Sequence, residues 1–397
     1  MPAPPPVRSP SSVLLPRLHP LVERVFLVFC AVAIALPGLA TVAGVDRAPQ
    51  AAEREDAAPP ADAGALPWAT LDGWTHALTR AFEGHFAFRD ALVRWQAAVR
   101  FVVLRVSPQP EVIRGKDGWL FYADDGGLED YLTPSLLSDE DLATWAATLQ
   151  HTQDWLAARG IAYLFVIAPG KSRVYPEFMP TSLHPVLATS RARQLLDYLA
   201  AHTTVHTLAL DRALADEKTR DRIYHRTDSH WNAAGALVAS REIVAALGRQ
   251  VPEAEWDPQA LAPDAFERRE TVSPGLDLAR MLRLDHWLTE TTIGRVPRVP
   301  FEARVVEPAV PDPEFAEGRV VTVRDGSSLP RALVYRDSFG SALIPFLGEQ
   351  FSRGVFLWEY DVDPAAVAAE RPRVVIQEWA SRRLHNRLPY DPFADQQ

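Results

Sequence analysis

The chain has almost no cysteine, and basic residues do not dominate its charge. Cys30 is the single cysteine among 397 residues, and it lies in an apolar run near the N-terminus. This excludes a disulfide within the chain and a cysteine-based metal site. The formal net charge is -10 and the pI is about 5.6, so we expect no nucleic-acid partner. Apolar residues make up 47% of the chain, enough for a large buried core.

One stretch almost without charged side chains runs over residues 25–45. Its length of about 20 residues matches the roughly 30 Å hydrocarbon core of a bilayer. Arg8, Arg17 and Arg24 precede it, which predicts a cytoplasmic N-terminus at residues 1–24 and a periplasmic remainder. The alternative is a cleaved signal peptide. Because the run is longer than a usual signal segment, we expect an inner-membrane anchor, so that the membrane is a partner through this segment.

Two further segments precede the main domain. Residues 46–66 are rich in Ala, Pro and acidic residues without an aromatic side chain, which predicts a disordered tether. Residues 67–110 carry Leu71, Trp74 and Leu78 at helical spacing, which predicts a helical arm. The alternative is that these are the first helices of the domain itself.

Residues 111–390 alternate between strand and helix patterns. Strands are expected within 111–122 around a Lys-Asp-Gly turn, and at 161–168, 204–210, 331–335, 355–359 and 374–378. Helices are expected at 138–159, 188–202, 232–247 and 341–350. This order predicts an α/β domain with a mostly parallel sheet and helices on both faces. Residues 251–318, rich in Pro, Glu and Arg, are expected to be an insertion or lid.

Two short polar segments can carry chemistry. Asp228 and His230 stand two apart before a predicted helix, and Ser338 follows the predicted strand 331–335. A carboxylate that orients an imidazole, and an imidazole that deprotonates a serine, make a nucleophile. The sequence therefore predicts a serine-dependent acyl-transfer enzyme. The alternatives are a structural histidine with Asp228 in a turn, and an Asp337 and Ser338 that only cap the following helix.

Other residues are candidates for substrate contacts. The backbone N–H of Phe339 and the close approach permitted by Gly340 suit an oxyanion site. Lys171 and Tyr175 follow the strand 161–168, so they are expected at the same sheet edge, although a surface turn with a packed Tyr175 is an equal alternative. Glu378 and Arg382 have the spacing of a helical ion pair.

The Asp-x-His segment is also half of a metal site. We expect no metal and no other cofactor, because no further histidine or carboxylate follows at ligand spacing.

Five motifs in the same order resemble the alginate O-acetyltransferase family, whose catalytic domain is SGNH-hydrolase-like. They are Asp-x-His-Trp at 228–231, Asp-Ser at 337–338, and the segments 82–90, 112–122 and 168–177. The resemblance covers about residues 80–385. It implies a flavodoxin-like, SGNH-hydrolase-type sheet with Ser338 as nucleophile, His230 as general base and Asp228 as its orienting residue. One departure is Arg336, which stands where the superfamily usually has the Gly of Gly-Asp-Ser.

The resemblance also implies a function. The chain would receive an acetyl group from a multi-pass membrane acyltransferase and transfer it to hydroxyls of an exported polysaccharide, as in alginate biosynthesis. Two alternatives stay open: an esterase that removes acetyl groups from such a polysaccharide, and a non-catalytic polysaccharide-binding subunit of an export complex.

Overall fold

The computed structural model describes residue 28, residues 89–307 and residues 318–393. The predicted tether, residues 67–88 of the predicted arm and all of the predicted anchor except Val28 lie outside these ranges. None of the helices within the described ranges has the length and hydropathy to cross a membrane. The chain divides into two units, residues 1–96 and 97–397. Described residues of the predicted arm form helix α3 (Arg89–Ala98) and a π-helical turn, Val99–Val103.

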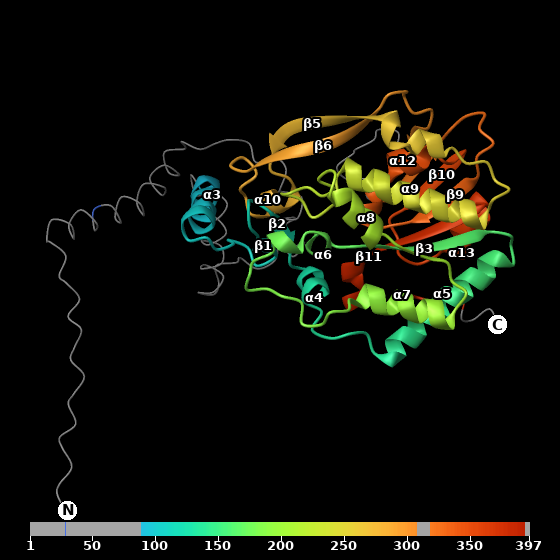
Figure 1. Ribbon diagram of the computed structural model, residues 1–397, viewed down its shortest axis with the longest axis horizontal. Helices are drawn as coiled ribbons and strands as arrows, with labels where there is room; N and C mark the ends of the chain where they lie inside the picture. Colours follow the sequence, from blue (N-terminus) through green and yellow to red (C-terminus); the bar gives the residue numbers. More distant parts are fainter. Residues whose placement is uncertain (1–27, 29–88, 308–317, 394–397) are drawn as a thin grey trace, which may run out of the picture. The chain divides into compact units, whose positions relative to one another are not determined.

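A seven-stranded sheet forms the centre of the second unit, in the order β4-β3-β11-β9-β10-β8-β7. Its strands are β3 (Ala162–Ala168), β4 (Thr207–Ala209), β7 (Arg304–Glu307), β8 (Arg319–Val323), β9 (Arg331–Tyr335), β10 (Arg353–Leu357) and β11 (Val374–Ala380). The first five strands in spatial order run parallel. Strand β8 pairs antiparallel with β10, and β7 pairs antiparallel with β8, so β7 again runs in the direction of the first five. The predicted mostly parallel sheet is confirmed (Figure 1).

The strand order corrects the flavodoxin-like expectation. A flavodoxin-like sheet places its third strand beside its first. Here the last strand, β11, lies between β3 and β9 instead. All seven residues of β11 are buried, which suits the centre of a sheet covered on both faces. Strands β7 and β8 were not predicted, because β7 falls in the segment assigned to an insertion and β8 follows it directly.

Helices cover both faces of the sheet, as expected. Alternate residues of β3 divide between two cores: Leu164 and Val166 belong to one, and Tyr163 and Phe165 to the other. The first core is completed by α8 (Asp211–Lys218), α9 (Ala233–Gln250) and α12 (Ile344–Gly348). The second is completed by α5 (Asp139–Ala157), α7 (Arg191–His202) and α13 (Pro364–Glu370), as Figure 1 shows.

Local chemistry explains where several elements begin. Ser138 caps α5 in a capping box with Asp141, and Asn232 caps α9 by accepting from two backbone N–H groups. The strands β1 (Val112–Arg114) and β2 (Leu120–Tyr122) pair antiparallel across the predicted turn. In that turn Asp117 and Gly118 both have positive φ, as a tight hairpin requires.

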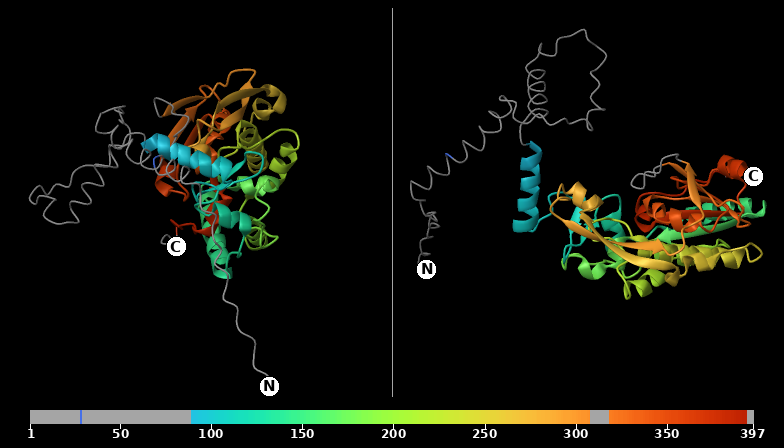
Figure 2. Two further views of the ribbon diagram at one scale, coloured as in Figure 1. Left: turned by 90° about the vertical axis from the view of Figure 1, so that its left-hand side faces the viewer. Right: turned by 90° about the horizontal axis from the view of Figure 1, so that it is seen from above.

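The segment predicted as an insertion has two parts. Strands β5 (Phe266–Pro274) and β6 (Thr289–Pro297) form a hairpin outside the main sheet, with α10 (Asp277–Met281) between them (Figure 1 and Figure 2). Two 3₁₀ turns, Pro258–Leu261 and Pro263–Ala265, precede it. Strand β7 instead joins the edge of the main sheet, so this segment is only partly an insertion.

Three neighbouring strands deliver polar segments to one edge of the sheet. Short helices α6 (Lys171–Val174) and α11 (Ser338–Ser341) follow β3 and β9, and the 3₁₀ helix Ser381–His385 follows β11. Because β3, β11 and β9 are adjacent and parallel, their carboxyl ends meet at the same edge. Ligand sites of open α/β sheets lie at this edge.

Candidate active site

Ser338 stands at the turn between β9 and α11. Asp337 is the N-cap of α11: its Oδ1 accepts a hydrogen bond from the Phe339 backbone N at 2.9 Å. The half-buried Ser338 is the first residue of the helix. The predicted helix 341–350 is instead two short helices, α11 and α12. Asp337 therefore caps the helix, as the capping alternative proposed. Ser338 is the next residue, and its side chain is not used in the cap.

The structure gives local roles to the two predicted oxyanion residues. The Phe339 N–H is already used by the Asp337 carboxylate, so that donor is not free in this structure. Gly340 lies against the Arg336 side chain, and a Cβ placed there would approach the Arg336 Cβ to 2.5 Å. Glycine is therefore required here for packing, and a contact of either residue with substrate stays a prediction.

The Asp337 turn is fastened to the neighbouring strand β11. Asp337 Oδ2 accepts from the Ala380 backbone N at 2.9 Å, and Glu378 Oε2 accepts from the Asp337 backbone N at 3.1 Å. Glu378 is fully buried on β11. The predicted pair of Glu378 with Arg382 does not form on a helix, since Glu378 is in a strand and Arg382 lies nearest the carboxylate of Asp125, at 3.6 Å.

Arg336, which replaces the usual glycine, is fully buried beneath this turn. One of its terminal nitrogens donates to the Ser341 hydroxyl at 2.8 Å and to the Asp337 carbonyl at 3.2 Å. Its guanidinium lies 4.9 Å from the centre of the Trp358 ring. The side chain thus supports the turn from the protein interior.

Asp228 and His230 lie in a tight loop between α8 and α9. The loop closes through a bridge between Tyr224 and Trp231 and a hydrogen bond from the His225 backbone N to the His230 carbonyl. Asp228 Oδ1 lies 2.8 Å from His230 Nδ1 and accepts from the His230 backbone N at 2.9 Å. The carboxylate therefore fixes both the ring and the backbone of His230.

The Asp228–His230 loop lies beside the Ser338 turn. The indole N–H of Trp231 donates to the Phe339 carbonyl at 3.1 Å, and the His230 ring meets the Phe339 ring edge-on with 5.0 Å between centres. Because Asp228 occupies Nδ1, Nε2 is the remaining ring nitrogen. It is buried and has no hydrogen-bond partner among the described residues. An unpartnered imidazole nitrogen next to a serine turn is what a general base requires.

Charges around the pair set its protonation. Burial acts to lower the pKa of His230, but the hydrogen bond and charge of Asp228, with the charge of Asp277, raise it above its ordinary value. Burial acts to raise the pKa of Asp228, and its bond to His230 and the charge of that ring outweigh this and hold it well below its usual range. Asp228 is therefore an ionised partner that stabilises an imidazolium.

Lys171 and Tyr175 form hydrogen bonds with the backbone of this loop. The Lys171 ammonium donates to the carbonyls of His225 at 3.1 Å and Asp228 at 2.5 Å, and burial lowers its pKa to about 8. The Tyr175 hydroxyl accepts from the Ile223 backbone N at 3.1 Å inside the core. Both polar groups thus position backbone, and their predicted contact with substrate stays a prediction.

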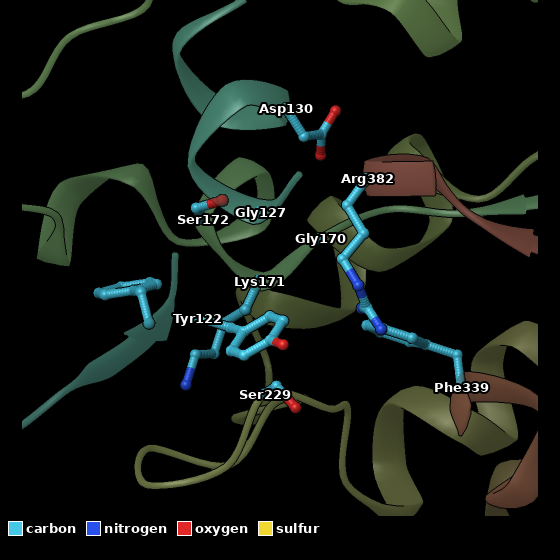
Figure 3. A pocket seen from close by; sticks show the side chains of 10 residues that line it. Tyr122, Gly127, Asp130, Gly170, Lys171, Ser172, Ser229, Phe339 and Arg382 are labelled. Atoms are coloured by element: carbon cyan, nitrogen blue, oxygen red, sulfur yellow. The ribbon is translucent and has the colours of Figure 1, made fainter. Parts of the chain in front are cut away.

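A small pocket opens beside the loop, with a volume of about 30 Å³. Lys171, Ser229, Phe339 and Arg382 are among the residues that line it, and Figure 3 shows Arg382 extending toward Phe339. The Arg382 guanidinium lies 5.6 Å from the ring centres of both Phe339 and Tyr122. No side-chain hydrogen bond of Arg382 is found among the described residues. The pocket therefore presents a cation with unused donors.

Sequence and fold comparisons now bear on the site. The model of the family described as "SGNH hydrolase-like domain, acetyltransferase AlgX" matches residues 112–313, slightly more than half of the chain. The chain belongs to this family. The matched range contains Asp228 and His230 and ends before Ser338.

Relatives of this family member are named as acetylases. A probable alginate O-acetylase AlgJ of Pseudomonas syringae pv. tomato is 27% identical over 216 residues, 53% of this chain and 51% of the relative. One from Azotobacter vinelandii is 25% identical over 332 residues, 77% and 79% of the two chains. The chain spans about half the length of several of the curated relatives it matches.

A solved structure agrees with the SGNH-like fold. Bacillus cereus PatB1 with a sulfonyl adduct superposes with a TM-score of 0.52 at 16% identity, covering 69% of this chain and 97% of that one. At this identity the likeness shows the fold alone.

The reason given for expecting no metal in this AlgX-family chain needs correction. The structure supplies the third possible ligand that sequence spacing did not show, a second carboxylate: possible ligand atoms of Asp228, His230 and Asp277 lie within 4.8 Å of one another. However, the 2.8 Å contact of His230 Nδ1 with Asp228 is a hydrogen bond. A ring nitrogen that donates a proton has no lone pair for a cation. The chemistry of this donor set therefore fits an oriented imidazole.

Sequence reasoning missed Asp277 and Glu290, and it assigned Arg382 only to an ion pair with Glu378. Asp277 comes from α10, Glu290 from β6, and Arg382 from the 3₁₀ helix after β11. Glu290 accepts from both the backbone N and the hydroxyl of Thr227 at 2.8 Å. No local motif marks Asp277 or Glu290, because each reaches the loop across a large sequence separation.

Proposed function

We propose that this chain is an O-acetyltransferase that carries an acetyl group on Ser338 and transfers it to hydroxyls of an exported polysaccharide. The observation that carries the proposal is the Asp228–His230 pair, whose buried Nε2 is unpartnered among the described residues and whose ring packs on the residue after Ser338. Membership of an acetyltransferase family supports the acetyl chemistry. The names of the relatives support an alginate-type acceptor.

In the first half of the proposed reaction, His230 Nε2 accepts the Ser338 hydroxyl proton while Ser338 Oγ bonds to the acetyl carbon. The bond from that carbon to the donor group breaks, and the donor leaves with the proton from His230. In the second half, a sugar hydroxyl gives its proton to His230 and attacks the acetyl carbon. Ser338 Oγ then leaves and recovers the proton.

Arg382 supports an anionic acceptor. Its guanidinium lines the pocket with unused donors, and guanidinium groups bind carboxylates through paired N–H bonds. A uronate polymer carries one carboxylate on each sugar.

Turnover of a small acetyl ester, measured with and without a uronate polysaccharide, tests this function. We expect Ser338→Ala and His230→Ala to lose several orders of magnitude while melting as the wild type does. Ser352→Ala, a serine distant from the loop, serves as the matched control and should keep full turnover. If Ser338→Ala keeps near wild-type turnover, the nucleophile is wrong.

The same assay separates the two alternatives. Acetyl groups found on the polysaccharide support a transferase, whereas acetate released from an acetylated polysaccharide without transfer supports an esterase. Binding of the polysaccharide with no turnover of either kind supports a non-catalytic subunit.

We further propose that residues 25–45 anchor the protein in the inner membrane and that residues 46–397 are periplasmic, where a multi-pass membrane acyltransferase supplies the acetyl group. The apolar run and the three preceding arginines support this topology. Protease added to spheroplasts should digest the catalytic domain. Protection of that domain in intact spheroplasts would exclude the periplasmic placement.

A further inference from the structure

A second carboxylate lies beside the Asp228–His230 pair. Asp277 is the first residue of α10, between the two strands of the β5–β6 hairpin. Its Oδ2 lies 3.9 Å from His230 Nδ1, and its side chain is 34% exposed. Asp228 approaches the same nitrogen at 2.8 Å. Two carboxylates therefore face one side of the imidazole and leave Nε2 on the other.

Ser229 connects Asp277 to the histidine. Asp277 Oδ1 accepts from the Ser229 backbone N at 3.0 Å, and Asp277 Oδ2 accepts from the Ser229 hydroxyl at 2.6 Å. That hydroxyl oxygen lies 3.2 Å from His230 Nδ1. Asp277 thus holds the residue between Asp228 and His230 by its main chain and its side chain together. Movement of Asp277 would move the ring.

We propose that Asp277 is a positioning residue for His230, which fixes the loop through Ser229 and adds a second negative charge behind the imidazole. The inference rests on the proposed function insofar as His230 is the general base there. The added charge stabilises the imidazolium that forms when Ser338 gives up its proton. Asp277 acts only through His230 and does not itself touch the reacting atoms.

Charged groups from several elements face this cluster. Asp228 belongs to the same loop, and Arg382 comes from the 3₁₀ helix after β11 and opposes the charge on His230. Lys171 of α6 faces Asp277 and Asp228. His225 and Arg222 lie farther along the loop, and Arg222 forms an ion pair at 2.9 Å with Glu290 of β6. Asp228 and Asp277 are the two carboxylates close to Nδ1.

Asp228 and Asp277 lose their negative charges at different pH values. Asp228 keeps a pKa well below its usual range because of its bond to His230. Burial and the charge of Asp228 raise the pKa of Asp277 to about 6. The second charge is therefore present above about pH 6 and is lost below it. His230 should lose part of its proton affinity over this window.

The isosteric variant Asp277→Asn tests the proposal, because it removes the charge and keeps an oxygen that can accept from Ser229. Two quantities are measured: the pH profile of acetyl-ester turnover, and the NMR titration of the His230 ring, assigned by comparison with His230→Ala. We expect the acidic limb and the NMR midpoint to move to lower pH by about half a unit or more. Turnover on the plateau should fall about fivefold.

Three further variants sharpen the result. Asp264→Asn removes one exposed charge from the same inserted segment and should move neither quantity. Asp277→Glu keeps the charge and should restore the acidic limb. Ser229→Ala keeps both charges and should shift the midpoint less than Asp277→Asn does; an equal shift would overturn the role of the charge.

The NMR titration keeps the test independent of catalysis. In the wild type the His230 resonance should show a second inflection near pH 6, where Asp277 takes up its proton. An unmoved midpoint in Asp277→Asn, or a wild-type titration with one inflection, would overturn the proposal. If Ser338→Ala kept full turnover, the proposed function would fail while the titration still decided the role of Asp277.

Discussion

Replacing Arg336 by glycine would restore the Gly-Asp-Ser pattern usual in the superfamily, and we predict that it destabilises this protein. Arg336 is fully buried, and its guanidinium makes hydrogen bonds at 2.8 and 3.2 Å to Ser341 and Asp337. It lies in a cluster with the buried carboxyls of Asp337 and Glu378. Burial and the charge of Asp337 raise the pKa of Glu378 well above its ordinary value. With Glu378 protonated, the cluster contains one cation, Arg336, and one anion, Asp337, so its charges balance.

The magnitude follows from what the deletion leaves behind. Asp337 would remain as a buried anion without the charge of Arg336 nearby, and its carbonyl would lose a donor; an uncompensated buried charge costs about 3–5 kcal/mol. The vacated side-chain space adds a cavity against Gly340. The unit of residues 97–397 should have an unfolding entropy of about 0.6 kcal/mol/K, so a loss of about 4 kcal/mol corresponds to roughly 6 °C in Tm. This is a large share of the about 5–15 kcal/mol that folded domains have.

Thermal melting and urea unfolding of purified Arg336→Gly measure this cost. Arg336→Met is the matched comparison, because it keeps most of the stem against Gly340 and removes only the guanidinium. We expect Arg336→Met to be less destabilised than Arg336→Gly. If Arg336→Gly unfolds within about 1 kcal/mol of the wild type, the supporting role inferred for Arg336 is refuted.

Two other predictions concern single carboxyl groups. Asp228→Asn should lose most acetyl-ester turnover while the protein stays folded, because an amide can donate to Nδ1 and favour the wrong tautomer; in the serine-protease triad the equivalent change costs about 10⁴-fold. A loss below about threefold would reduce the site to a Ser338–His230 dyad. Glu378→Gln should gain stability relative to the wild type as pH rises above about 4.5, the ordinary pKa of the group, because a raised folded-state pKa contributes stability at low pH that is lost through that pKa. Parallel unfolding curves at pH 5 and pH 8 check this; an equal difference at both values would contradict it.

The sequence predicts the parallel strands well because each is a short, almost wholly apolar run between turn residues. It does not predict their order. Strand β11 is the last described strand along the chain and lies between β3 and β9. Its local sequence pattern does not indicate which strands it pairs with. Pairing depends on which faces remain to be covered once the other elements have packed, which is a property of the whole domain.

Asp228 and His230 are predictable because their contact is local, whereas the order of the strands depends on the whole domain. Asp228 and His230 interact within one loop, so their spacing in the sequence is their spacing in space. Asp277 is different, since it reaches Ser229 across 48 residues and belongs to a segment without a recognisable motif. The roles of Lys171 and Tyr175 also depend on long-range contacts. Their position after β3 predicts the sheet edge, and only the fold shows that their polar atoms face backbone groups.

The position of β11 explains how the two halves of the site are joined. Its end supplies the Ala380 N–H to Asp337 in the serine turn. The next residue, Ser381, donates to the buried Asp130 carboxylate at 2.7 Å and accepts from the Gly170 N–H at 3.1 Å, beside Lys171. One strand end therefore contacts both the turn that carries Ser338 and the segment that supports the His230 loop. Because β11 is the last strand along the chain, the candidate site is complete only when this strand has inserted between β3 and β9.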